Sequence, residues 1–95
     1  MILKVKGGTL EFKDDYFVLQ DKLFLYSDIL YVEIVVMIYD KNEEYDLVKI
    51  KFKNKFFKCY ISIFSSDSGL AESFFRKKNI MVKRKYHDNR FDNND

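Results

Sequence analysis

The strongest pattern along the chain is an alternation of apolar residues within segment 23–39. From position 30 onward every second residue is aliphatic, namely Leu30, Val32, Ile34, Val36 and Ile38. A spacing of two places these side chains on one face of a β-strand. The positions between them are amphipathic, so we expect the other face to be partly covered. The pattern predicts a long strand with one buried face around which the rest of the chain is organised.

Shorter alternating segments surround this strand. They cover residues 2–6, 9–13, 16–19, 23–26, 46–53 and 56–64. Residue pairs that are common in turns separate several of them, for example Gly7-Gly8 and Asp14-Asp15. In the last segment the residues predicted to point inward are Phe57, Cys59, Ile61 and Ile63. Short connections between such segments favour antiparallel pairing.

The period changes after residue 64. Hydroxyl and carboxylate side chains at 65–68 are typical of a helix N-terminus. Two apolar pairs follow at a spacing of four, Leu70 with Phe74 and Ala71 with Phe75, and they place an apolar stripe on one side of a helix. We therefore predict a short helix over about 68–78. Residues 80–86 are compatible with a last strand, and residues 87–95 are predicted to form a flexible polar tail.

These elements predict a single domain over residues 1–86. Ninety-five residues suit one domain, and ten Phe and seven Tyr with no Pro favour strands over helices. The predicted fold is mainly β with some α+β character. It is a strongly curved antiparallel sheet, or partly open barrel, of six to seven strands with one short helix near the C-terminus.

Four groups of residues carry a resemblance to a known family. They are Gly8-Thr9-Leu10, Phe17-Val18-Leu19, residues 25–29 with Val32-Glu33, and residues 70–75. Over residues 8–79 the chain resembles the pleckstrin-homology-like superfold in its small bacterial form. The resemblance implies a curved sheet closed at one corner by the helix, and a binding role toward a phosphoinositide or a protein.

The lipid-binding pattern of that superfold is only partly present. The resemblance implies basic residues in the loop between the first two strands, and here Lys4 and Lys6 flank the glycine pair. Asp14-Asp15, in the next turn, would repel a phosphate group. Because one superfold serves many unrelated roles, the fold alone does not assign a function.

The sequence also argues against export and membrane insertion. A lone cysteine, Cys59, rules out a disulfide within the chain. No basic-then-apolar leader follows Met1, and the longest apolar segment contains Asp28 and Glu33. We expect a cytoplasmic protein.

Candidates for catalysis and metal binding are few. Cys59 alternates with inward-facing residues, where a thiol behaves as a small hydrophobic group, and His87 lies in the predicted tail. The acidic residues near the middle of the chain lack the glycine and terminal glutamate of a calcium loop; they are Asp40, Glu43, Glu44 and Asp46. We predict no enzyme activity, no metal site and no cofactor.

Charge is distributed unevenly along the chain, although the net charge is only +2. Residues 1–46 carry five lysines against ten acidic residues, a balance of −5. Residues 47–86 carry eleven basic residues against two acidic ones, a balance of +9, and residues 87–95 carry one arginine against three aspartates, a balance of −2. Such segregation bears on binding partners rather than on the fold.

The candidate binding residues come from three groups. Two are basic: Lys49, Lys51, Lys53 and Lys58 around one turn, and Arg76, Lys77, Lys78, Lys83, Arg84 and Lys85 further along. The third is the amphipathic face of the long strand, with Tyr31, Val35, Met37 and Tyr39. The basic residues either form a solvated face that prevents edge pairing or bind an anionic partner. The third group either contacts a partner or is covered by the helix or by a second copy of the chain.

The leading hypothesis is a non-enzymatic protein-interaction module that binds a protein with an acidic contact surface. A small single domain with this composition fits an adaptor or a stand-alone inhibitor, for example a phage or mobile-element protein that blocks a host defence complex. A homodimer is a further arrangement that the long strand allows. The alternative hypothesis is a surface for phosphate polyanions, either anionic lipid headgroups or nucleic acid.

Overall fold

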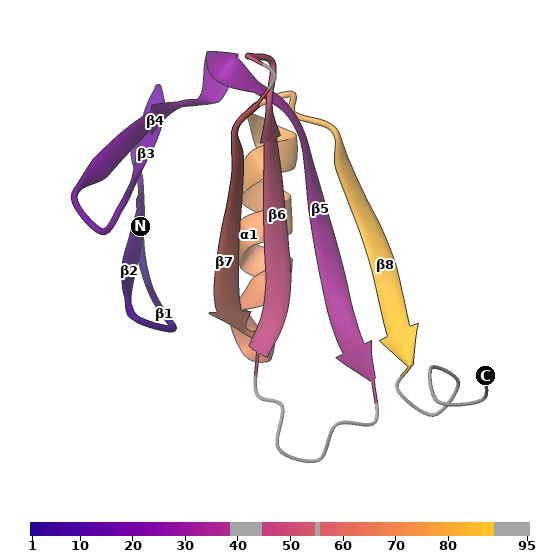
Figure 1. Ribbon diagram of the computed structural model, residues 1–95. Helices are drawn as coiled ribbons and strands as arrows, with labels where there is room; N and C mark the ends of the chain where they lie inside the picture. The colour runs from indigo at the N-terminus through magenta and orange to yellow at the C-terminus, as the bar shows by residue number, and fades with distance from the viewer. Residues whose placement is uncertain (39–44, 55, 89–95) are drawn as a thin grey trace.

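The computed structural model describes residues 1–38, 45–54 and 56–88, and Figure 1 shows their arrangement. In these residues the chain forms eight strands, one α-helix and two short 3-10 helices, at Tyr26–Asp28 and Ser65–Asp67. The larger elements are β1 (Ile2–Val5), β2 (Gly8–Phe12), β3 (Tyr16–Leu19), β4 (Lys22–Leu25), β5 (Ile29–Ile38), β6 (Tyr45–Phe52), β7 (Lys58–Phe64), α1 (Ser68–Lys77) and β8 (Val82–Asp88).

The eight described strands form one sheet in the order β4-β3-β2-β1-β7-β6-β5-β8. The prediction of a mainly β fold with one short helix is confirmed. The predicted number of six to seven strands was too low, since the described residues form eight. The antiparallel prediction holds for every described pairing except that of β5 with β8, which is parallel. The reason is the connection: α1 carries the chain back along the sheet before β8 begins. β8 ends at Asp88, two residues inside the segment predicted as a tail, and residues 89–95 lie outside the described residues.

The sheet consists of two half-sheets that meet at a short seam. The N-terminal half-sheet contains β1–β4, and the C-terminal half-sheet contains β7, β6, β5 and β8. Within the described residues, the ladder between β1 and β7 has one register pair, Val5 with Ile63. Next to it the Lys6 N–H donates a hydrogen bond to the Ser62 carbonyl oxygen at 2.9 Å. Backbone hydrogen bonding therefore joins the half-sheets over a small part of their length.

Aromatic side chains pack across the two half-sheets, directly and through α1. α1 lies behind the C-terminal half-sheet in Figure 1, and its Phe75 is fully buried. The Phe75 ring lies 5.3 Å from the ring of Phe12 and 6.2 Å from the ring of Phe17. Phe24 of β4 also stacks directly on Phe52 of β6 at 5.5 Å. Each such pair contributes about 0.5–1.5 kcal/mol beyond the burial of its surface.

The central strand is buried as predicted at two of its five inward positions, while Val36 is half-buried and the side chain of Ile38 lies outside the described residues. Val32 and Ile34 are fully buried, whereas Leu30, predicted to be buried, is 52% exposed. The pairing of β5 with β6 shifts register between Ile29 and Tyr31. A bulge of this kind reverses the direction of the side chains on one side of it, so Ile29 enters the core in place of Leu30.

Two other residues predicted to be inward-facing are exposed. Phe57 is 67% exposed because β7 begins only at Lys58, so the alternation does not extend back to it. Leu70 is 52% exposed, since the buried side of α1 is formed by Ser68, Ala71 and Phe75.

Asp46 was assigned both to the start of the alternating segment 46–53 and to the acidic group. It lies in β6, as the alternation predicted, and is only 3% exposed. The Ser65 hydroxyl donates a hydrogen bond to Asp46 Oδ1 at 3.1 Å, which helps to offset the cost of burying the carboxylate. The other members of the group, at positions 40, 43 and 44, lie outside the described residues.

The turn between β3 and β4 is a two-residue connection. Gln20 and Asp21 have φ angles of 49° and 69°, as the type I′ turn of a tight hairpin requires. The Gln20 side chain donates a hydrogen bond to the Gly7 carbonyl oxygen at 2.9 Å. A Cβ atom at Gly8 would lie 2.8 Å from Gln20 Cγ, so glycine is needed there to hold this turn against the first hairpin.

A group of charged side chains attaches α1 to β8. Glu72 accepts a hydrogen bond from Arg84 Nη2 at 2.6 Å and one from Arg76 Nε at 3.0 Å. Arg76 also donates to the Val82 carbonyl oxygen at 3.0 Å. The hydrogen bonds from Arg84, and then those from Arg76, lower the pKa of Glu72 although partial burial opposes the shift. The ionised carboxylate therefore stabilises the fold.

The first prediction concerns the buried face of β5. Ile34→Ala should lower the free energy of unfolding by about 2–5 kcal/mol, because it leaves a cavity among packed side chains. Leu30→Ala is the matched control, and its loss should stay below about 1 kcal/mol because Leu30 is half exposed. Denaturant titration measures both values. Equal losses for the two variants would show that the faces of β5 have been assigned wrongly.

The second prediction concerns the pH dependence that Glu72 creates. Because its pKa in the folded state lies below the ordinary value of 4.5, its contribution is fully present above that value and is lost as the pH falls through the folded-state pKa. The unfolding free energy of the native chain should therefore exceed that of Glu72→Gln most at neutral pH, and the gap should narrow on acidification. Titrations at several pH values measure the gap, and a gap that stays constant down to about pH 3 would contradict the prediction.

Candidate interaction surface

The face of the C-terminal half-sheet that is turned away from α1 is called the outer face here. Its side chains come from alternate positions of four neighbouring strands, which lie about 4.8 Å apart. The strand registers arrange these positions in three rows: Lys58, Lys51 and Tyr31; Tyr60, Lys49, Glu33 and Lys83; and Ser62, Leu47, Val35 and Lys85.

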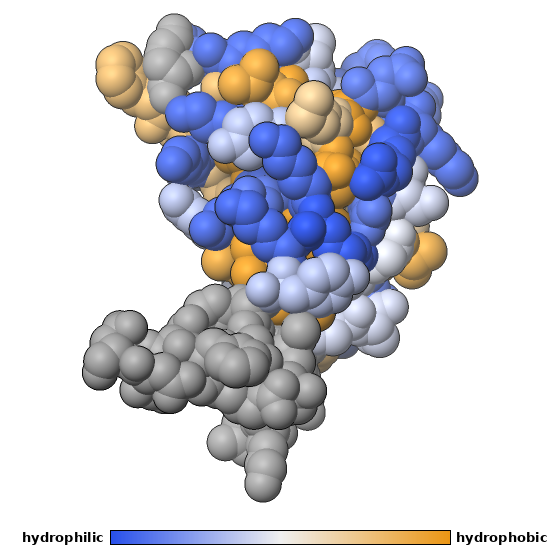
Figure 2. All heavy atoms as spheres, turned by 90° about the vertical axis from the view of Figure 1, so that its right-hand side faces the viewer, coloured by the Kyte–Doolittle hydropathy of each residue, from blue (hydrophilic) through white to orange (hydrophobic). Residues whose placement is uncertain are grey.

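The outer face collects lysines from both of the basic groups that the sequence indicated. Lys49, Lys51 and Lys58 come from β6 and β7, and β8 adds Lys83 and Lys85 from the other end of the chain. Figure 2 views the molecule from the β8 side and shows strongly hydrophilic side chains over much of this side, with apolar side chains visible between them. The fold thus builds one basic surface from two segments that are far apart in the sequence.

Glu33 lies within this basic surface. Its carboxylate oxygens lie 3.7 Å from Lys49 Nζ and 3.3 Å from Lys85 Nζ, and its side chain is 12% exposed. Five lysines against one glutamate leave the three rows with a charge of +4. Because the lysines at these ion pairs are substantially exposed, the pairs contribute little to stability. Their main effect is to hold two lysines in place and to put one negative charge inside a positive field.

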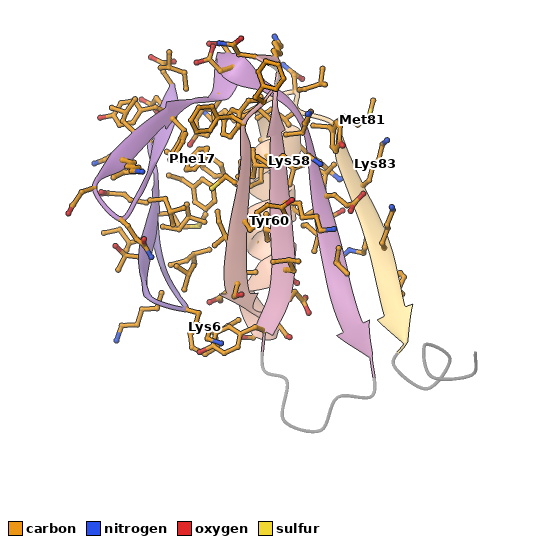
Figure 3. The ribbon with its side chains drawn as sticks, in the orientation of Figure 1. Lys6, Phe17, Lys58, Tyr60, Met81 and Lys83 are labelled. Carbon is orange, nitrogen blue, oxygen red and sulfur yellow. The ribbon has the colours of Figure 1, made fainter. Side chains whose placement is uncertain are left out.

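Two tyrosines lie among the lysines. Lys83 Nζ lies 4.9 Å from the centre of the Tyr31 ring, a cation–π arrangement, while Tyr60 is 57% exposed. A shallow hollow of about 90 Å³ is lined by both tyrosines together with Lys49, Lys51, Lys58, Glu33 and Ile50. Figure 3 shows Tyr60 and Lys58 on β7, and Lys83 on β8, on the side of the sheet that faces the viewer.

The fold divides the basic group at 76–85. Arg76 and Arg84 bind Glu72 and attach α1 to β8, so they are used for stability. Lys78 Nζ lies 5.6 Å from the centre of the Tyr26 ring, and Lys77 is exposed on α1. Because successive residues of a strand point to opposite faces, only Lys83 and Lys85 of this group reach the outer face.

The remaining predicted binding residues contribute less. Val35 is half-buried beside Leu47, and Lys53 is exposed just beyond β6. The side chain of Met37 and the whole of Tyr39 lie outside the described residues.

Several residues with exposed or half-buried side chains are absent from the predicted binding residues. Tyr60 and Leu47 belong to the outer face, and Phe56 and Phe57 are 97% and 67% exposed at the turn before β7. A signal for the last two was present: two consecutive bulky apolar residues cannot both point inward from a strand. At least one of them had to be exposed, and the structure exposes both.

The described residues offer little that suits catalysis. Burial raises the pKa of the Cys59 thiol, although nearby Lys22 acts in the opposite direction, so the thiol is protonated and weakly nucleophilic at neutral pH. The side chain of His87 lies outside the described residues. In the part of the chain that the structure describes, no three His, Cys, Asp or Glu side chains converge to hold a metal ion. None of the described helices has the length and apolar character needed to cross a membrane.

No family model, curated protein or solved structure matches this chain.

Proposed function

We propose that this chain is a non-enzymatic protein-interaction module whose outer face binds an acidic surface of a partner protein. The observation that carries the proposal is the gathering of five lysines from β6, β7 and β8 around two tyrosines on one side of the sheet. Such a surface attracts acidic partners at long range, and its tyrosines supply contact area at low entropic cost. The module acts as an adaptor or as an inhibitor, according to what its binding does to the partner.

The composition of the outer face favours a protein over a phosphate polyanion. Glu33 lies between lysines, where it would repel a phosphate group but can accept hydrogen bonds from a protein. The third row adds the aliphatic side chains of Leu47 and Val35, which suit apolar contacts. A mixed surface of this kind matches the polar and apolar composition of transient protein interfaces.

The exposed ring of Tyr60 supports a second candidate function. A tyrosine beside Lys49 and Lys58 on an open sheet can stack on a base while the lysines contact phosphates. Single-stranded nucleic acid is therefore the alternative ligand of the same face.

The third prediction tests the proposed function with a charge reversal. The double variant Lys51→Glu, Lys83→Glu lowers the charge of the three rows from +4 to zero and leaves the lysines that pair with Glu33 unchanged. In pull-downs from nuclease-treated lysate of the cells that produce the protein, the native chain should retain a partner protein in stoichiometric amount. The amount of this partner retained by the double variant should be at least about tenfold lower.

The control for this pull-down is Lys77→Glu, which reverses an exposed charge on α1, away from the outer face. It should retain the same protein as the native chain. Circular dichroism confirms that each variant is folded. Recovery of the same protein by the double variant, or its loss in the control, would contradict the assignment of the outer face.

The fourth prediction separates protein binding from polyanion binding. Fluorescently labelled poly(dT) and vesicles containing phosphatidylserine are titrated with the native chain at low salt. If the proposal is correct, any binding of these polyanions to the native chain should persist in the double variant. Binding that falls with log salt at a slope near the number of neutralised phosphates, and that disappears in the double variant, would favour the alternative function instead.

A further inference from the structure

β7 has an edge that no described strand occupies along its first half. One edge pairs with β6 from Lys58 to Phe64, whereas the other meets β1 only at Ile63 and Ser62. Backbone groups of alternate residues point to the same edge of a strand. The N–H and C=O groups of Lys58 and Tyr60 therefore point in the same direction as those of Ser62, toward a place where the described residues provide no partner strand.

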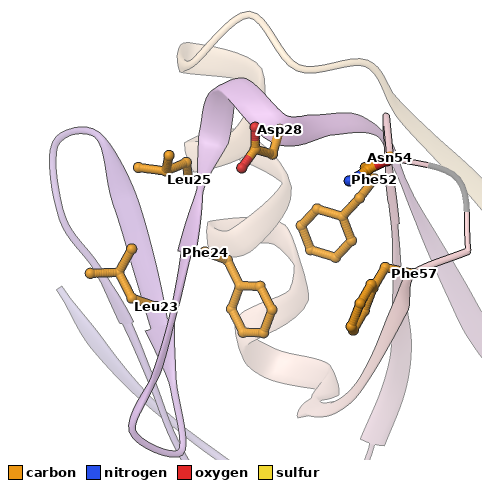
Figure 4. A pocket seen from close by; sticks show the side chains of 7 residues that line it. All are labelled: Leu23, Phe24, Leu25, Asp28, Phe52, Asn54 and Phe57. Atoms are coloured by element: carbon orange, nitrogen blue, oxygen red, sulfur yellow. The ribbon is translucent and has the colours of Figure 1, made fainter.

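An apolar groove runs beside this edge. One hollow of about 370 Å³ is lined by Leu23, Phe24, Leu25, Asp28, Phe52, Asn54 and Phe57. A neighbouring hollow of about 280 Å³ is lined by Leu19, Gln20, Lys22, Phe24, Phe57, Lys58, Cys59 and Tyr60. Phe24 and Phe57 line both, so the two hollows form one groove between the β3–β4 hairpin and the start of β7. In Figure 4, Phe24 and Phe57 lie on opposite sides of this space.

Phe57 leaves apolar surface exposed on one side of the groove. It is 67% exposed and faces Phe24, whereas Leu23 and Leu25 alternate with Phe24 along β4 and point away from it (Figure 4). An exposed aromatic ring beside a groove offers a large apolar contact area to another molecule. The groove opens beside the backbone groups of Lys58 and Tyr60, for which the described residues provide no partner strand, so it offers apolar contacts and hydrogen bonds to the same ligand.

The charges at the two ends of the groove differ. Lys22 and Lys58 lie at the end formed by the β3–β4 turn, and Asp28 lies at the other end. This arrangement favours an occupant that places an acidic residue at the end near Lys22 and Lys58. The volume of the groove is sufficient for a few apolar side chains, which is what one face of a short strand presents.

We propose that an extended segment of a partner protein adds as a strand to the edge of β7 at Lys58–Tyr60. Its apolar side chains, at alternate positions, occupy the groove between Phe24 and Phe57, and an acidic residue at one end faces Lys22 and Lys58. Main-chain hydrogen bonds to the strand edge then supply affinity, and the groove supplies specificity. The site shares Lys58 and Tyr60 with the outer face, whereas neither Lys51 nor Lys83 lines the groove.

The fifth prediction tests this site with selected peptides. A display library of random peptides about ten residues long is panned against the full chain, and the strongest binder is synthesised. The peptide should show alternating apolar residues with an acidic residue at one end. Its affinity should fall at least about tenfold in Phe57→Asp and stay unchanged in Phe56→Asp, because Phe56 is even more exposed but does not line the groove. It should also stay unchanged in the Lys51→Glu, Lys83→Glu variant, which separates this site from the outer face.

Amide hydrogen exchange gives a second readout. The amides of Lys58 and Tyr60 should exchange rapidly in the unbound chain and become protected when the peptide binds.

Failure to select a binder, equal loss of affinity in both phenylalanine variants, or unchanged exchange at these amides would overturn the proposal. Concentration-dependent dimerisation that Phe57→Asp abolishes, measured by sedimentation equilibrium, would show that the occupant is a second copy of the chain and would overturn the assignment of a partner protein.

Discussion

The structure depends on the packing of Phe75 between two half-sheets that share little backbone hydrogen bonding. The described ladder between β1 and β7 has one register pair, so it cannot hold the halves together along their length. Phe75 is fully buried and contacts Phe12 and Phe17 of the N-terminal half-sheet, while α1 also contacts β5 and β8. The helix is therefore the element through which the two halves form one hydrophobic core.

The same arrangement accounts for both proposed binding surfaces. Because α1 lies against one side of the C-terminal half-sheet, the described residues leave the opposite side uncovered, and this side collects the lysines of β6, β7 and β8. Because the half-sheets diverge from the seam at Val5 and Ile63, the first half of β7 has no described neighbour on one edge. A continuous ladder between β1 and β7 would have strengthened the sheet but would have removed this edge and the groove beside it.

Much of this fold could be predicted from residue patterns, and the errors have local physical causes. Alternation identified the strands and the buried positions Val32 and Ile34, and a change of period located α1. Leu30 was misplaced because a bulge depends on pairing between strands and leaves little trace in the sequence of one strand. For the site, runs of lysine indicated a basic surface, but which residues belong to it could be known only from the order of the strands. Lys83 and Lys85 belong to it, whereas the side chain of Arg84 turns inward to Glu72. The groove was missed because Phe57 had been assigned to the core.

Native-state hydrogen exchange of Phe75→Ala tests most directly whether the helix unites the two half-sheets. Truncating this buried ring should cost about 3–5 kcal/mol. If the account is correct, amides in both halves, such as those of Leu10 in β2 and Ile34 in β5, should lose protection by the same amount, because they unfold together. Undiminished protection at Ile34 with a large loss at Leu10 would show that the C-terminal half-sheet is stable on its own, and would contradict the account.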